Sequence, residues 1–60
     1  MKQVTKDEYL IFVNRHSLRN GGLAGTNPHI WINVSAKGET LAKEVIHSNL
    51  KHEYYISEEL

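Results

Sequence analysis

Four histidines are the residues of this 60-residue chain best suited to acid–base or metal chemistry. His47 and His52 are five positions apart, and His16 and His29 lie at the two ends of one segment. No pair has the four-residue helical spacing that presents two imidazoles to zinc. Cysteine is absent, which removes thiolate ligands and thiol nucleophiles. The sequence therefore predicts neither a metal site nor a cofactor.

Ser17 follows His16 directly in the sequence. A hydrolytic triad needs a serine, a histidine and an orienting carboxylate that converge in a pocket, and adjacency in the sequence does not provide this. A chain of this size also has little room for a pocket of roughly 300 Å3. We expect a protein that is not an enzyme.

The segment between Asn14 and His29 could bind an anion. Its glycines Gly21, Gly22 and Gly25 could form a backbone nest, although their spacing matches neither the Walker loop nor the dinucleotide fingerprint. A flexible connection built from ordinary turn residues is the competing interpretation. If phosphates are bound, the contacting side chains are expected to be Arg15, His16, Arg19 and Lys37.

The overall charge gives no sign of a general polyanion binder, because 7 Lys and Arg balance 7 Asp and Glu. No apolar stretch approaches the ~20 residues that span a bilayer, so no membrane partner is expected. The N-terminal residues lack the apolar run of a secretory signal. These features predict a cytoplasmic protein.

Three elements can be predicted around these residues. The apolar spacing favours an amphipathic helix over about 36–50, whose buried stripe holds Leu41, Ala42, Val45, Ile46 and Leu50. Alternating apolar residues predict a strand at 29–34. The aromatic and β-branched residues at 53–57 predict another strand.

The run Tyr9–Val13 is apolar at every position, which favours a strand at about 8–14 that is covered on both faces. A helix over 5–18 competes with it. The capping pattern that joins Thr5 to Glu8 supports the helix, as does the possible stop signal at 20–22.

With the strand, the chain is a single domain over 1–60 of the α+β class. Connection rules predict a small three-stranded, mainly antiparallel sheet (β-β-α-β, spatial order 2-1-3) with the amphipathic helix on one face and a long loop at 15–28. Alternation directs the following residues to the helix: Tyr9, Ile11, Val13, Ile30, Ile32, Val34, Tyr54 and Ile56.

The other sheet face is then expected to carry an aromatic patch, made of Leu10, Phe12, Trp31 and Tyr55. Such a patch is larger than a small monomer usually leaves open. The patch could be covered in three ways: by the loop, folded back with Leu18 and Leu23 as anchors; by a second copy in a homodimer; or by a different macromolecule. The residues do not decide between them.

The predicted function is that of a small non-catalytic binding module, a protein-binding regulator or inhibitor that uses the exposed aromatic sheet face. The alternative is a nucleic-acid-binding domain, in which the basic loop from Arg15 to Arg19 contacts phosphates and the aromatic residues stack on unpaired bases.

Overall fold

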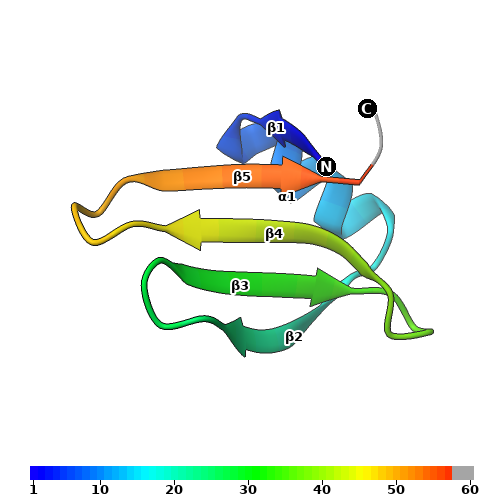
Figure 1. The fold of residues 1–60 in the computed structure, drawn as a ribbon. Coiled ribbons are helices and arrows are strands. Elements are labelled where there is room, and N and C mark those ends of the chain that lie inside the picture. The colour runs from blue at the N-terminus through cyan, green and yellow to red at the C-terminus, as the bar shows by residue number, and fades with distance from the viewer. Residues whose placement is uncertain (58–60) are drawn as a thin grey trace.

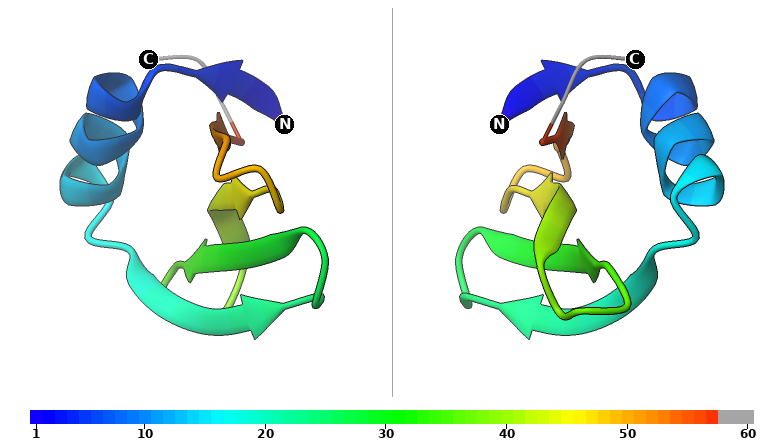
Figure 2. Two further views of the ribbon diagram at one scale, coloured as in Figure 1. Left: turned by 90° about the vertical axis from the view of Figure 1, so that its left-hand side faces the viewer. Right: turned by 90° about the vertical axis from the view of Figure 1, so that its right-hand side faces the viewer.

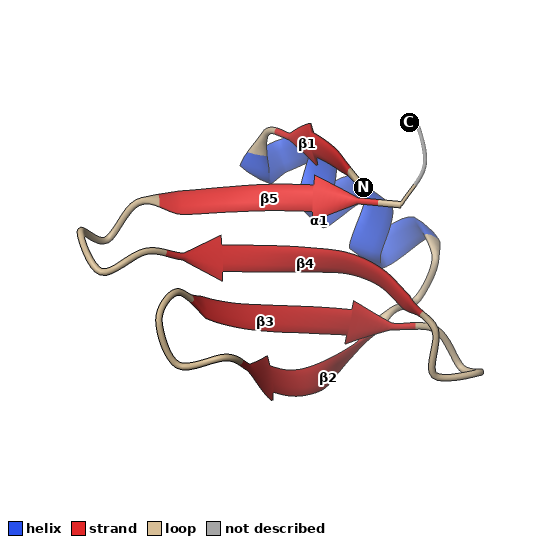
Figure 3. Cartoon of the chain, in the orientation of Figure 1, coloured by secondary structure: helices blue, strands red, loops and turns tan. Residues whose placement is uncertain are grey.

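A computed structural model describes residues 1–57 of the chain. It is a small α+β fold with one helix and one five-stranded antiparallel sheet in the order β1-β5-β4-β3-β2 (Figures 1 and 3). The expected three-stranded sheet is therefore wrong. The elements are β1 Lys2–Val4, α1 Lys6–Arg15, β2 Arg19–Ala24, β3 His29–Val34, β4 Thr40–Ile46 and β5 His52–Ile56.

The helix α1 replaces the strand that was expected at 8–14. Thr5 caps it: the Thr5 hydroxyl accepts a hydrogen bond from the backbone N–H of Glu8 (3.3 Å), and the Glu8 carboxylate accepts one from the N–H of Thr5 (3.0 Å). Asp7 and Glu8 in the first turn and Arg15 in the last turn also suit the helix dipole. These local interactions outweigh the strand propensity of Tyr9–Val13, and the competing helix is the one that forms.

The helix expected at about 36–50 is also wrong, because this region contains a tight turn and the central strand β4. The Ser35 hydroxyl accepts hydrogen bonds from the backbone N–H groups of Lys37 and Glu39, both at 3.2 Å. Gly38 has φ 83°, a conformation that a side chain would strain. The residues that were read as a first helical turn therefore close the β3–β4 hairpin.

The apolar spacing in this region misled because β4 is apolar toward both sides of the sheet. Ala42 and Val45 are both buried and point to opposite faces. Leu41 is an extra residue, since Ala42 pairs with Asn33 while Thr40 pairs with Val34. A bulge and two buried faces together give adjacent apolar pairs, which imitate one face of a helix.

The two other predicted strands correspond to β3, which covers 29–34, and β5, which lies one residue before 53–57. The segment 15–28, expected to be a loop, contains the edge strand β2. Gly21 is required there, because a Cβ at this position would lie 2.8 Å from Cγ1 of Val34. Glycine is a typical turn residue, so this segment was read as a loop. Here Gly21 instead allows β2 to pack closely on β3.

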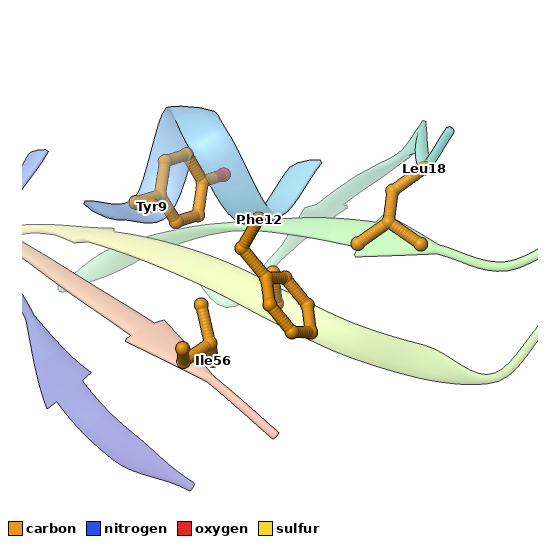
Figure 4. Packing of buried hydrophobic residues seen from close by; sticks show 5 residues of the cluster. Tyr9, Phe12, Leu18 and Ile56 are labelled. Carbon is orange, nitrogen blue, oxygen red and sulfur yellow. The ribbon is translucent and has the colours of Figure 1, made fainter. Parts of the chain in front are cut away.

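The sheet is curled, and α1 lies on its concave side (Figure 2). We call this side the helix-side face and the other side the open face. Between α1 and the sheet lies a small core of Tyr9, Phe12, Leu18, Ala42 and Ile56 (Figure 4). Asn33 of β3 also lies on the helix-side face, and its amide donates a hydrogen bond to the Tyr9 hydroxyl of α1.

The expectation that Ile30, Ile32 and Val34 face the helix is therefore wrong. They alternate with Asn33, so they lie on the open face, which no element of residues 1–57 covers.

Candidate protein-binding site

Four neighbouring strands each contribute one residue to a row across the helix-side face. In the strand register Leu23 pairs with Trp31, Trp31 with Glu44, and Glu44 with Tyr54. Directly paired residues of antiparallel strands point to the same face, with Cβ atoms about 4.5–5.5 Å apart. We call these four residues the Trp31 row.

One end of the Trp31 row is exposed. The helix α1 packs on β5 and leaves the edge of the sheet at β2 uncovered. Trp31 is 37% exposed, and its neighbour Leu23 is 48% exposed. A large aromatic and an aliphatic side chain therefore lie next to each other at the surface.

Glu44 lies in the middle of the row and is partly buried. Its Oε2 atom is 2.6 Å from Nδ1 of His52, which fixes the position of the carboxylate. Within residues 1–57 Glu44 has no lysine or arginine partner. The site thus has a fixed carboxylate whose charge no permanently charged side chain neutralises.

Two tyrosines form the covered end of the site. The rings of Tyr9 and Tyr54 are 5.0 Å apart and tilted by 52°. Burial, with a smaller contribution from the Glu44 carboxylate, raises the pKa of Tyr54 above its usual value. Burial and Glu44 raise the pKa of Tyr9 in the same way. Both hydroxyls therefore stay protonated and uncharged near neutral pH.

The structure does not bring together the four residues of the predicted aromatic patch. Phe12 is 1% exposed and lies in the core, whereas Leu10 is exposed on α1. Trp31 is on the helix-side face and Tyr55 is on the open face, where it pairs with Lys43. Of the four, the Trp31 row contains Trp31 alone.

The predicted anion-binding residues are all exposed and gather at one end of the molecule. Arg15 and His16 end α1, Arg19 begins β2, and Lys37 is in the turn between β3 and β4. Figure 1 shows these three places at the same end of the sheet. Of the aromatic residues that were expected to stack on bases, Phe12 lies beside His16, with ring centroids 4.3 Å apart, but is only 1% exposed. Trp31 and Tyr55 lie on opposite faces of the sheet.

Sequence reasoning missed Leu23, Glu44 and Tyr54 as site residues. Tyr54 was expected to face the predicted helix. Leu23 was considered as an anchor of a loop, and Glu44 fell on the outer side of the expected helix. The alternation in β4 could have placed Glu44 beside Ala42 on one face, if 40–46 had been read as a strand. The pairing of Leu23 with Trp31 depends on the bulge in β2 and has no signal in the sequence.

The described part of the chain contains no detected cavity and no cluster of three or more residues suited to hold a metal ion. None of its helices has the length and apolar character needed to cross a membrane. Comparisons with family models, curated proteins and solved structures found no significant match.

Proposed function

We propose that this chain is a non-catalytic binding module that contacts another protein through the Trp31 row. The observation that carries the proposal is the exposed pair of Leu23 and Trp31 beside the partly buried carboxylate of Glu44. Tryptophan is enriched among the residues that contribute most of the binding energy at protein interfaces. Charged residues are depleted at interface cores, so a single carboxylate there should discriminate between partners.

The backbone beneath this surface is already ordered, which favours binding. Trp31 is in β3, which is hydrogen-bonded to β2 on one side and to β4 on the other. A side chain on a paired strand loses less conformational freedom on binding than one on a flexible loop. A module that works by occupying a surface suits a regulator or inhibitor, and the cytoplasm remains its proposed location.

The test compares protein capture by the wild-type chain and by a variant that combines Leu23→Thr with Trp31→Thr. Threonine is β-branched, a shape that strands accept, and it removes the apolar contact area. Leu50→Asn is the matched control, because Leu50 is 79% exposed in the turn between β4 and β5, lies outside the Trp31 row, and has a φ of 65° that asparagine tolerates. Circular dichroism checks that all three chains fold.

We expect a protein retained by the wild-type chain and by Leu50→Asn to be lost with the double variant. Light scattering on the same three samples identifies self-association: a dimer that only the double variant disrupts would make a second copy the partner. Equal retention and equal mass for all three chains would overturn the proposal.

A further inference from the structure

We infer that the Trp31 row receives an arginine side chain of a protein partner, with the guanidinium group placed on the Glu44 carboxylate. This inference rests on the proposed function and adds the chemistry of the partner. It depends on the charges and aromatic rings around Glu44 and on the exposed side chain of Leu23 at the end of the row.

The charge distribution favours a cation. Strand alternation places one acidic residue, Glu44, on the helix-side face of the five described strands, and the row itself contains no lysine or arginine. His52 holds the carboxylate without providing a permanent positive charge. A purely apolar partner would bury this carboxylate with only the His52 imidazole as its partner and without a permanent cation, which is unfavourable. A partner that brings its own cation removes this cost.

The aromatic neighbours favour arginine over lysine. In the strand register Trp31 and Tyr54 flank Glu44 on either side. A guanidinium group is planar, so it can stack on an aromatic ring while its N–H groups donate to a carboxylate. A lysine ammonium is compact and more strongly hydrated, and it cannot do both in the same way.

The exposed end of the row indicates what should accompany the arginine. Leu23 lies beyond Trp31, on the side away from Glu44. An apolar residue next to the arginine of the partner could rest on Leu23. The site therefore fits a short segment with an arginine beside an aliphatic residue.

The test titrates the full chain with two short peptides, acetyl-Gly-Arg-Leu-Gly-amide and the same peptide with citrulline in place of arginine. Citrulline has nearly the same shape but no charge. Trp31 is the one tryptophan of the chain, so its indole N–H gives a single assigned NMR signal. Glu44→Gln removes the charge from the site. Glu53→Gln is the matched control, because Glu53 belongs to the same hairpin but lies on the open face.

We expect the arginine peptide to shift the Trp31 signal and to bind about tenfold more weakly to Glu44→Gln, as the loss of one charge-assisted hydrogen-bonded pair implies. Glu53→Gln should bind as the wild type does. Equal binding of the arginine and citrulline peptides to the wild-type chain would overturn the inference, and this comparison does not depend on the folding of any variant.

The two proposals can fail separately. If the peptides bind equally but the double variant at Leu23 and Trp31 still loses its captured protein, the inference of an arginine in the partner is wrong. The proposal that the Trp31 row binds a protein is then still supported. If the capture experiment also shows no difference, the surface itself is wrong.

Discussion

The two faces of β3 differ in how their apolar side chains are covered. The open face carries Ile30, Ile32 and Val34 from β3 and Val45 from β4. No described element lies over these residues, yet Val45 is only 8% exposed. The helix-side face is less aliphatic and is partly covered by α1, yet it leaves Trp31 and Leu23 at the surface.

Polar side chains lie beside the aliphatic ones on the open face. The ammonium nitrogen of Lys43 lies 5.1 Å from the centre of the Tyr55 ring. Glu53 is 2.8 Å from Nε2 of His47, and the Tyr55 hydroxyl donates to the same carboxylate at 3.3 Å. In the strand register Lys43 pairs with Ile32 and Glu53 pairs with Val45, so these polar side chains lie next to aliphatic ones. Aliphatic content alone therefore does not identify a contact surface.

The largest expected effect lies in the core of the helix-side face. Phe12→Ala should lower the free energy of unfolding by about 3–5 kcal/mol, because it removes a fully buried ring. That is a large part of the stability of a small domain. Urea denaturation followed by circular dichroism measures it.

Leu10→Ala is the matched control for this substitution. Leu10 is on the same helix but is exposed, so its loss should have a much smaller effect. Two variants of equal stability would contradict the helical assignment, because a strand would place Leu10 and Phe12 on the same side.

On the open face, Val45→Thr should lower the free energy of unfolding by about 1–3 kcal/mol, since it places a hydroxyl where the valine is shielded. It should leave capture of the partner unchanged. The double variant at Leu23 and Trp31 is expected to lose capture of the partner, and urea denaturation of the same variant separates this loss from the stability that the partly buried Trp31 contributes. If Val45→Thr abolished capture while the chain stayed folded, the open face would be the contact surface.

The faces of β3 show what the sequence could and could not predict. Alternation correctly separated Ile30, Ile32 and Val34 from Trp31 and Asn33, because strand geometry alone fixes it. Which set meets the helix could not be derived, since it depends on where α1 crosses the sheet. The expectation that Ile30, Ile32 and Val34 face the helix was wrong for that reason.

The elements themselves show the same limit. The helix start at Thr5 was readable, because its capping residues are close in the sequence. The strand β4 was not, because its stabilising partners β3 and β5 are hydrogen-bonded across the sheet. Tertiary pairing overrides a local pattern in such a central strand. Glu44, the charged residue of the candidate site, was misplaced for that reason.

The smallest predicted effect is an acid sensitivity of the open face. The hydrogen bond from His47 is the main cause that holds the pKa of Glu53 below its usual value of 4.5. A carboxyl group with a lowered pKa in the folded state stabilises the fold above its unfolded pKa, and this contribution is lost as the pH falls through the folded pKa. Glu53→Gln should therefore reduce stability at pH 6.

The difference between the wild-type chain and Glu53→Gln should disappear below the folded pKa, because Glu53 is then protonated and resembles glutamine. The lowered pKa of Glu8 contributes equally to both chains and cancels in the comparison. Urea denaturation of both over a series of pH values downward from pH 6 measures the effect. A difference that stays unchanged over the whole series would mean that the Glu53 charge does not stabilise the open face.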